Sequence, residues 1–490
     1  MKMATKAKYR EHRLTRTKII ATVGPACGDR ETLTDLVTAG VDIFRLNFAH
    51  GTHEWLAGIV ATIRGISAEL GIAIGILGDL SGPKIRLGRL PDDGVLCSEG
   101  SDFTFIRGRQ PQTRHELTCT YEALIDDVQA GDRVLLADGT VVMRVVEKEA
   151  EAGFAKCVVE SSGTVRSRQG VNLPGVALST PSLTEKDRKD LAWAIEHDLD
   201  YVGLSFVRSS NDIVELRQAI TDHGSDCRPL IVAKIEKGEA VNELEAIIDE
   251  ADAVMVARGD LGVEVDIVQV PAIQKRIIRL CNQRRVPVIT ATQMLDSMQH
   301  SELPTRAEAS DVANAVLDGS DAVMLSGETA VGQYPRESVA TMSRIAREAE
   351  KLLPEESHVE DTAEASHQAM RVTEAVAVGA VATACELNAA LIAVATSSGR
   401  SALAISKERS RVPILAFTNC ERAARRMTLL WGVSPKLSGK SVLTADQVAL
   451  KATDWGQAEG VLSTGDTVVV MASSHWSAAG HDSMLVHVVE

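Results

Sequence analysis

Charged and polar residues recur where short apolar runs of this sequence end. They are Arg45 with Asn47, Asp79, Lys234 with Glu236, Arg258 with Asp260, Thr292, and Ser326 with Glu328. The carboxylates of Glu236 and Asp260 suit Mg²⁺, which binds through one or two carboxylates and keeps positions for water and substrate. Lys234 and Arg45 could hold a phosphoryl group beside the ion, because phosphoryl transfer depends mainly on positioning and charge neutralisation. These residue types favour metal-assisted phosphoryl transfer, with Thr292 as a proton donor or relay.

Such residues need a scaffold that brings strand ends together. Eight β-branched runs each lead into a helix-like stretch, at 17–24, 41–48, 72–80, 201–206, 229–236, 253–260, 286–293 and 322–329. Apolar runs that alternate with helix-like stretches are typical of parallel strands that are buried on both faces of a sheet. Eight of them predict an α/β fold with a closed (β/α)₈ TIM barrel, favoured over an open doubly wound sheet because eight strands close a barrel. Any one of the polar residues alone would be an ordinary loop charge or ion pair, whereas their convergence on one barrel mouth favours catalysis.

Two further segments lie outside the barrel pattern. The third and fourth runs start 129 residues apart, whereas the other starts are 24 to 36 residues apart. The residues in this gap alternate like exposed β-strands, and Asp138-Gly139 is typical of a hairpin turn. We therefore expect a barrel over 1–82 and 183–353, and an inserted β-barrel-like lid domain over 83–182. A second α/β pattern predicts a C-terminal open-sheet regulatory domain over 354–490.

Composition excludes several classes of protein. The formal charge is −15, so no excess of Lys and Arg is available for nucleic acid. No apolar run is long enough to span a bilayer, so we expect no membrane association. The basic N-terminus lacks the apolar segment of a secretory signal, and the eight cysteines are scattered. Scattered cysteines are typical of reduced thiols, so a cytoplasmic location is predicted.

Longer motifs resemble those of the pyruvate kinase family. They include TKIIATVGPA (17–26), GDLSGPKIRLG (78–88), MVARGDLGVE (255–264), ITATQMLDSM (289–298) and the run from 304 to 330. The resemblance extends over nearly the whole chain and implies barrel, lid and C-terminal domains. It also implies the last step of glycolysis, in which phosphoenolpyruvate and ADP give pyruvate and ATP. A homotetramer is the usual assembly that it implies.

The resemblance assigns roles to individual residues. Glu236 and Asp260 would bind Mg²⁺ or Mn²⁺, while Lys234 and Arg45 would hold the phosphoryl group. The substrate carboxylate would meet the amides around Arg258, Gly259 and Asp260, together with Thr292. The family positions that contact the nucleotide correspond to Asn47, His50, Arg86 and Lys186. Candidates for delivering the enolate proton are Thr292 with a water relay, helped by Ser326 and Glu328.

Two departures from the family pattern concern the monovalent cation. Ala49 replaces a Ser that helps to bind K⁺ in many members, and Lys84 replaces a Glu. Leu80 stands where a Thr is usual, directly after Asp79. Because a ligand is lost and a positive charge gained together, we interpret Lys84, near Asp79, as a substitute for the cation. The sequence thus predicts that K⁺ is not required.

The loop Thr396–Ser401 is the candidate effector site. It comprises Thr396, Ser397, Ser398, Gly399, Arg400 and Ser401, between a predicted strand and a helix. Hydroxyl groups and helix N-terminal amides together can bind an anion; a simple helix cap is the alternative. The later segment 473–484 lacks the run seen in members activated by fructose 1,6-bisphosphate. A sugar monophosphate or AMP is therefore the expected effector.

Two alternatives are weighed against this interpretation. A barrel lyase or aldolase could use the same Lys, Glu and Asp on a metal-bound enolate, but it would not need a β-domain after the third strand. A degenerate barrel that only senses sugar phosphates would be expected to have lost Lys234 or a metal ligand, and it has lost neither.

Overall fold

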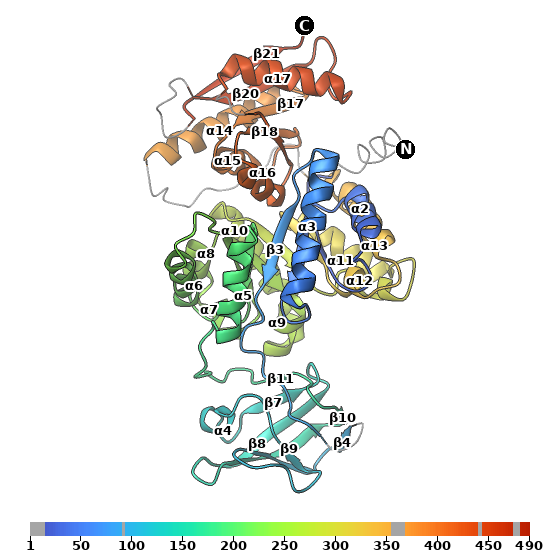
Figure 1. Ribbon diagram of the computed structural model, residues 1–490, viewed down its shortest axis with the longest axis vertical. Coiled ribbons are helices and arrows are strands. Elements are labelled where there is room, and N and C mark those ends of the chain that lie inside the picture. Colours follow the sequence, from blue (N-terminus) through green and yellow to red (C-terminus); the bar gives the residue numbers. More distant parts are fainter. Residues whose placement is uncertain (1–14, 91–93, 354–367, 440–442, 474–480) are drawn as a thin grey trace.

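The computed structural model describes residues 15–90, 94–353, 368–439, 443–473 and 481–490. Three units follow one another along its long axis, with the lid at one end, the barrel in the middle and the C-terminal unit at the other end (Figure 1). The predicted segment 473–484 lies largely outside the described residues. No described helix combines the length and the apolar character that crossing a membrane requires. The eight cysteines, all in the described part, are free thiols.

The central unit is the predicted closed barrel of eight parallel strands. In chain order its strands are β1 (Lys18–Thr22), β2 (Ile43–Asn47), β3 (Gly75–Asp79), β12 (Tyr201–Leu204), β13 (Leu230–Ile235), β14 (Ala253–Ala257), β15 (Val288–Ala291) and β16 (Ala322–Leu325). The barrel closes through pairing of β1 with β16 and of β3 with β12. Each strand falls within the run that predicted it, so this part of the prediction is confirmed.

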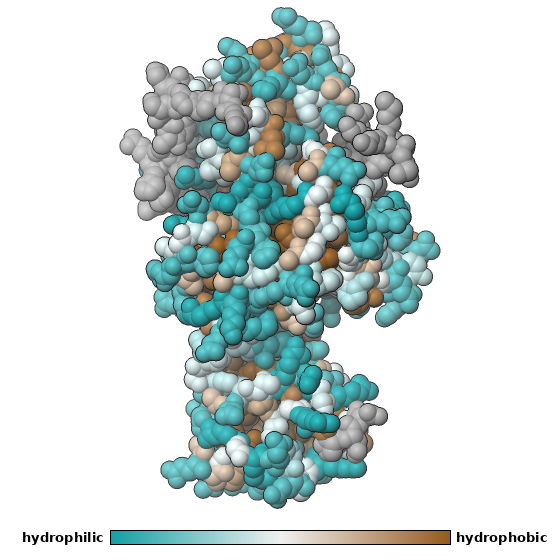
Figure 2. Space-filling model, in the orientation of Figure 1, coloured by the Kyte–Doolittle hydropathy of each residue, from teal (hydrophilic) through white to brown (hydrophobic). Residues whose placement is uncertain are grey.

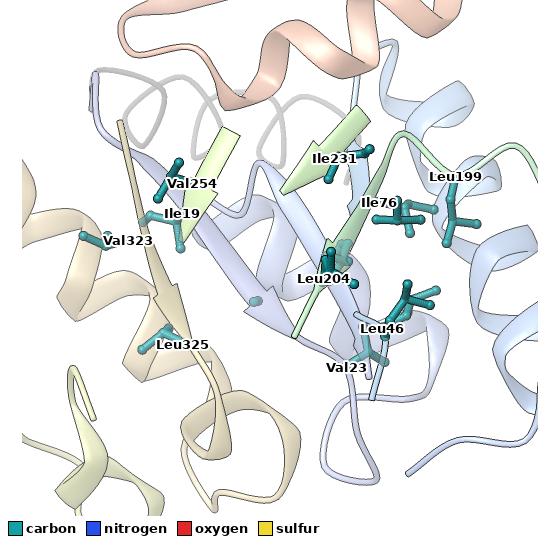
Figure 3. Packing of buried hydrophobic residues seen from close by; sticks show 14 of the residues in the cluster. Ile19, Val23, Leu46, Ile76, Leu199, Leu204, Ile231, Val254, Val323 and Leu325 are labelled. Atoms are coloured by element: carbon teal, nitrogen blue, oxygen red, sulfur yellow. The ribbon is translucent and has the colours of Figure 1, made fainter. Parts of the chain in front are cut away.

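Alternate side chains of each strand serve two cores. Ile20 points to the barrel interior with Val232 and Met255, while Ile19 packs outward against the surrounding helices. Figure 3 shows part of the outer core, where Val254 and other aliphatic side chains fill the space between elements. Aliphatic packing on both faces explains why so few aromatic residues suffice.

The helices of the barrel unit connect its strands. They are α2 (Arg30–Ala39), α3 (His53–Leu70), α5 (Glu185–Glu196), α6 (Ser210–Asp222), α7 (Gly238–Asn242), α8 (Leu244–Glu250), α9 (Arg258–Glu264), α10 (Val270–Gln283), α11 (Arg306–Leu317), α12 (Gly327–Ala330) and α13 (Pro335–Glu350). Short 3₁₀ turns cover Ile267–Gln269 and Asp296–Gln299. Several helix starts are fixed by side-chain caps; for example, Thr184 and Asp187 form a capping box before α5.

The inserted unit is mainly β-structure, as predicted. Its elements are β4 (Val95–Cys97), β5 (Asp102–Ile106), β6 (Glu116–Leu117), α4 (Leu124–Asp127), β7 (Arg133–Leu136), β8 (Val141–Glu149), β9 (Phe154–Ser161), β10 (Gly163–Val165) and β11 (Val171–Asn172). Six strands form one sheet in the order β11-β7-β8-β9-β5-β6, and β4 pairs with β10. Asp138 and Gly139 have φ of 54° and 83° in the β7–β8 turn, as a type I′ hairpin requires. A waist separates this unit from the barrel (Figure 2).

The C-terminal unit is the predicted open α/β sheet. It contains α14 (Gln368–Glu386), β17 (Leu391–Ala395), α15 (Arg400–Lys407), β18 (Ile414–Thr418), α16 (Glu421–Arg426), β19 (Val433–Leu437), α17 (Ala445–Ala458), β20 (Thr467–Ala472) and β21 (Ser483–Val488), with a 3₁₀ turn at Met427–Leu429. The strand order is β19-β18-β17-β20-β21, and only β21 runs antiparallel to its neighbour.

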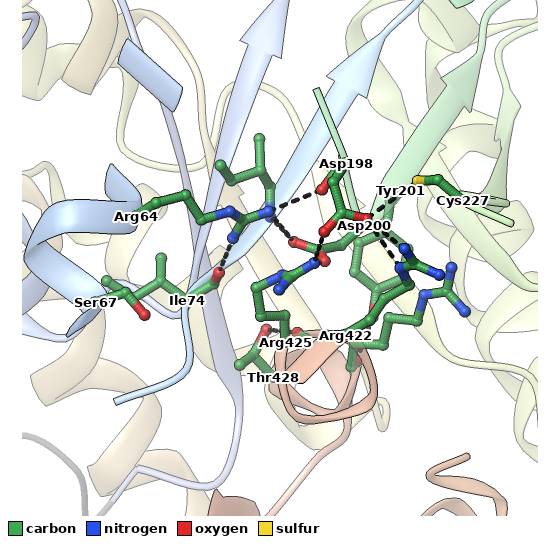
Figure 4. Close-up of polar contacts among 12 residues, drawn as sticks. Arg64, Ser67, Ile74, Asp198, Asp200, Tyr201, Cys227, Arg422, Arg425 and Thr428 are labelled. Atoms are coloured by element: carbon green, nitrogen blue, oxygen red, sulfur yellow. Dashed lines mark hydrogen bonds and ion pairs between the residues drawn. The ribbon is translucent and has the colours of Figure 1, made fainter. Parts of the chain in front are cut away.

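The C-terminal unit docks against the amino ends of the barrel strands. Asp200, which precedes β12, accepts hydrogen bonds from Arg425 Nε at 2.7 Å and Arg64 Nη2 at 3.0 Å (Figure 4). Arg425 also pairs with Asp198 at 2.5 Å. Because the lid lies at the opposite end of the barrel (Figure 1), the carboxyl ends of the strands face the lid.

A second buried contact fixes the same interface. Lys407, at the end of α15, binds Asp321 Oδ2 at 2.7 Å, and both side chains are almost completely buried. Asp321 directly precedes β16, so this contact also reaches the amino end of a barrel strand.

Candidate active site

Lys234 and Glu236 lie side by side at the carboxyl end of β13. Residues two apart on a strand point the same way, and Lys234 Nζ lies 2.9 Å from Glu236 Oε1. Glu236 Oε2 accepts a hydrogen bond from the Phe206 amide at 2.7 Å. Lys234 Nζ also contacts Ser205 Oγ at 2.7 Å and Asp79 Oδ1 at 3.3 Å. The amine is thus buried and held from three sides.

Arg45 joins this group through Asp79. Arg45 Nε donates to Asp79 Oδ2 at 2.7 Å, and its Nη1 donates to Thr22 Oγ1 at 3.1 Å. Burial alone would raise the pKa of Asp79, but Lys234 and Arg45 outweigh it and hold the pKa below its usual value. The two cations predicted to hold a phosphoryl group are therefore brought together by one ionised carboxylate.

Glu236 and Asp260 are the predicted metal ligands; Glu236 directly follows β13, and Asp260 lies in α9, which directly follows the neighbouring strand β14. Burial raises the pKa of Glu236, Lys234 opposes that shift, and the charge of Asp260 adds to it, which places the two carboxylates in each other's field. Among the described residues, no group of three or more His, Cys, Asp or Glu side chains forms a metal cluster. Two carboxylates still fit Mg²⁺, since that ion usually keeps several waters and binds substrate phosphates.

The segment from Arg258 to Asp260 opens helix α9 beside Thr292. The Gly259 amide donates to Thr292 Oγ1 at 2.8 Å, and Arg258 Nη1 binds Asp311 Oδ1 at 2.7 Å. Thr292 has φ of 67°, an uncommon conformation for a β-branched residue. Backbone strain of this kind occurs at functional sites when the surroundings enforce it.

Glu328 and Ser326 lie next to this segment. The Glu328 carboxylate accepts hydrogen bonds from the amides of Leu295 at 3.0 Å and Ser326 at 2.7 Å, which ties together the loops after β15 and β16. Burial raises the pKa of Glu328. Ser326 Oγ is buried and has no hydrogen-bond partner within the part of the chain that the structure describes. Glu328 therefore positions the loops, and the Ser326 hydroxyl is uncommitted.

Cations gather on the lid side of the mouth. Partial burial and the positive charges of Arg86, Arg45 and Lys84 lower the pKa of His50, so these four groups share one region. Such a concentration of positive charge attracts an anionic substrate despite the negative total charge of the chain.

The other two predicted nucleotide contacts border this region. Lys186 Nζ donates to the Phe48 carbonyl at 2.9 Å and to Asp190 Oδ2 at 2.6 Å, so part of its binding capacity is already used. Asn47 Oδ1 accepts a hydrogen bond from the Ala49 amide at 3.0 Å. Both residues therefore lie close to the loop that carries His50.

Lys84 lies beside a predicted metal ligand. Its Nζ lies 3.9 Å from Asp260 Oδ1, whereas Asp79 is paired with Lys234 and Arg45. Asp79 is the last residue of β3, and Lys84 lies five residues later, where the chain has left the barrel for the lid. The positive charge of Lys84 therefore acts directly beside a predicted metal ligand.

Two family models match the chain. The model described as "Pyruvate kinase, barrel domain" matches residues 14–339, and "Pyruvate kinase, alpha/beta domain" matches residues 374–487. The chain belongs to the pyruvate kinase family.

Curated relatives bear the same name. A pyruvate kinase of Geobacillus stearothermophilus is 40% identical over 475 residues, which cover 97% of this chain and 80% of that protein. Pyruvate kinase 2 of Synechocystis sp. (strain ATCC 27184 / PCC 6803 / Kazusa) is 43% identical over 474 residues, or 96% of this chain and 78% of that protein. The resemblance seen in the sequence is thus confirmed, and with it the kinase class of enzyme.

The candidate effector loop of this pyruvate kinase family member lies between β17 and α15. Thr396 Oγ1 accepts a hydrogen bond from the Gly399 amide at 3.0 Å, and Gly399 has φ of 89°. Ser397, Ser398 and Arg400 are exposed around this turn. Ser401 Oγ, in the first turn of α15, contacts His481 Nδ1 at 2.8 Å, and His481 lies two residues before β21.

Sequence reasoning missed several residues of the candidate site. Ser205 and the Phe206 amide, which follow β12, bind Lys234 and Glu236 directly. Inspection of the polar residues at strand ends could have found Ser205. The Phe206 amide gives no sequence signal, because its orientation depends on a φ of 56° at a bulky residue.

Proposed function

We propose that this chain transfers the phosphoryl group of phosphoenolpyruvate to ADP, with Mg²⁺ or Mn²⁺ held by Glu236 and Asp260. One observation carries the proposal: Lys234 and Arg45 meet at one buried carboxylate, Asp79, and a second buried carboxylate, Glu236, lies beside Lys234. This set provides two cations and two oxygen ligands at the carboxyl ends of barrel strands, where barrel enzymes carry their sites.

The residues divide the work by charge. Lys234 and Arg45 neutralise the phosphoryl group as it moves, while the amides at Arg258, Gly259 and Asp260 with Thr292 orient the substrate carboxylate. A divalent metal ion held by Glu236 and Asp260 would supply further charge neutralisation. Asn47, His50, Arg86 and Lys186 contact the nucleotide beneath the lid, residues 83–182, which closes over it.

Proton delivery to the enolate completes the reaction. Thr292 Oγ1 donates a hydrogen bond to the Ala291 carbonyl at 2.6 Å and accepts one from the Gly259 amide. These two contacts fix the orientation of the Thr292 hydroxyl group in the site. A water relay ending at Thr292, with the Ser326 hydroxyl and Glu328 alongside, would return the proton to carbon.

Lys84 takes the place of the K⁺ ion, so that K⁺ is not required. Its ammonium group, 3.9 Å from Asp260, adds the positive charge that a monovalent cation would bring. The rest of the proposal follows the family: a cytoplasmic homotetramer, activated at Thr396–Ser401 by a sugar monophosphate or AMP.

A lactate-dehydrogenase-coupled assay tests the reaction. Pyruvate should form in step with ADP consumption, only when Mg²⁺ or Mn²⁺ is present. Pyruvate formed without loss of ADP would instead indicate a lyase and overturn the proposal. Metal-dependent protection from heat with no turnover on any nucleoside diphosphate would indicate a sensor.

The cation claim has its own test. Activity should be equal in tetramethylammonium and KCl buffers, whereas the Lys84→Glu variant should require KCl. Lys189→Glu, the same charge change at an exposed position of α5, should remain indifferent to K⁺. A large activation of the unmodified chain by KCl would refute the role given to Lys84.

A further inference from the structure

Glu264 ends helix α9, and its carboxylate joins three parts of the molecule. Glu264 Oε1 accepts hydrogen bonds from Lys237 Nζ at 2.7 Å and from Asn172 Nδ2 at 3.3 Å. The side chains of Lys237 and Glu264 are only 6% and 2% exposed. Burying an ion pair costs desolvation free energy, which is recovered only when the geometry of the pair is good. A buried pair at this position therefore suggests a specific structural role.

The partners of Glu264 are neighbours of the metal ligands. Lys237 directly follows Glu236, and Asp260 lies four residues before Glu264, one turn away on the same short helix. The residue at the N-cap of α9, Ala257, offers no side-chain cap. The position of α9 therefore depends on other contacts: Arg258 pairs with Asp311 at its start, and Glu264 makes the most deeply buried ion pair at its end.

The lid meets α9 at the same place. Asn172 belongs to lid strand β11, and Lys84, at the base of the lid, lies 3.9 Å from Asp260. A methyl group built on Gly139, in the β7–β8 turn, would lie 3.8 Å from Val263 Cγ1. In Figure 1, α9 lies at the end of the barrel that faces β7 and β11. The helix that carries Asp260 is thus also the surface on which the lid rests.

We propose that Glu264 is a positioning residue, which holds Asp260 in place relative to Glu236 through Lys237 and passes the position of the lid to both through Asn172. The inference rests on the proposed metal site. Two carboxylates repel each other before the ion arrives, and the buried Glu264–Lys237 contact keeps their two elements from separating.

A direct measurement of Mn²⁺ binding tests whether Glu264 and Lys237 position the metal ligands. The free Mn²⁺ signal in electron paramagnetic resonance gives the dissociation constant without substrates or turnover. Lys237→Gln and Glu264→Gln should each weaken Mn²⁺ binding roughly tenfold, the lower end of what residues supporting metal ligands usually contribute. The kcat at saturating Mn²⁺ should change much less, because the ligands themselves remain. Exposed Glu54→Gln is the control and should bind as the unmodified chain does.

Lys237→Gln separates positioning from simple charge. Removing a positive charge near the site would tighten cation binding if only the electric field mattered, whereas loss of positioning weakens it. The double variant Lys237→Gln/Glu264→Gln, which leaves the net charge unchanged, should likewise bind Mn²⁺ weakly. Unchanged or tighter binding in Lys237→Gln overturns the inference and leaves the proposed reaction standing. If Glu264→Gln fails to fold, the Lys237→Gln result decides alone.

Asn172→Ala tests the lid connection. This variant should bind Mn²⁺ within about twofold of the unmodified chain but raise the KM for ADP several-fold, with Thr164→Ala on the same domain as control. An unchanged KM for ADP overturns the lid half of the inference. An unmodified chain that binds no Mn²⁺ overturns the metal site and this inference together.

Discussion

Replacing Lys234 by methionine should damage both stability and turnover, for reasons that one further variant can separate. Lys234 Nζ lies 2.9 Å from Glu236 Oε1 and 3.3 Å from Asp79 Oδ1, and its side chain is 10% exposed. Two unit charges about 3 Å apart attract by about 5–6 kcal/mol at an effective dielectric constant of about 20. Desolvation cancels part of this, and removal of one partner from a buried pair typically costs about 3–5 kcal/mol.

The loss of folding stability in Lys234→Met should appear as a lower thermal midpoint. For a barrel of this size, about 3–5 kcal/mol corresponds to a fall of roughly 6–20 °C. The kcat should fall by at least about 10²-fold to 10³-fold, the usual effect of removing one group that stabilises charge in the transition state. Scanning fluorimetry and the coupled assay at saturating substrates and Mn²⁺ measure the two quantities.

The double variant Lys234→Met/Glu236→Gln is the matched control. It removes the carboxylate that Lys234→Met leaves unpaired, while Arg45 and Asp79 keep each other. Most of the fall in the thermal midpoint seen in Lys234→Met should therefore be reversed, and turnover should stay low. Turnover of Lys234→Met within tenfold of the unmodified chain would refute the role of the amine, and a midpoint that does not recover in the double variant would refute the charge argument.

Three further predictions concern other parts of the chain. Replacing Thr396 and Arg400 by alanine should abolish activation by phosphorylated metabolites and spare basal turnover; unchanged activation in a metabolite panel would remove this site. Asp200→Asn should lower the thermal midpoint by roughly 6–12 °C, because removing the buried charge that pairs with Arg425 and Arg64 typically costs about 3 kcal/mol; an unchanged midpoint would contradict this. Burial lowers the pKa of Lys407 from 10.5 to about 8, so the folded chain binds fewer protons than the unfolded chain between these values and its stability should rise with pH there. The thermal midpoint of Lys407→Met should lack that part of the rise, and a difference from the unmodified chain that stays constant from pH 7 to 10.5 would argue against it.

The parts of the site that follow from strand geometry could be predicted from the sequence. Lys234 and Glu236 share a side because residues two apart on a strand must do so, and the structure places their charged atoms 2.9 Å apart. The barrel itself was predictable because each strand is an unbroken apolar run at nearly regular spacing. Family motifs then suggested roles for residues whose side chains lie on loops, and these roles stay predictions.

Contacts between distant segments could not be predicted. Lys84 contacts Asp260, and Asn172 contacts Glu264, because the base of the lid meets the barrel at α9, and no local pattern records where an inserted domain rests. Arg425 and Asp200 are 225 residues apart, and each alone looks like an ordinary surface charge. Such pairs depend on docking, which periodicity does not encode.

The contact of Arg425 with Asp200 also sets how far a disturbance must travel. Asp200 Oδ2 accepts the Ile76 amide at 2.9 Å, and Ile76 stands three residues before Asp79 on β3. At about 3.3 Å per residue, the path from the docked C-terminal unit to the acid that orients Lys234 is only about 10 Å of taut backbone. A shift of the C-terminal unit at this interface can therefore reach Lys234 through two hydrogen bonds, a short segment of β3 and the Asp79–Lys234 contact.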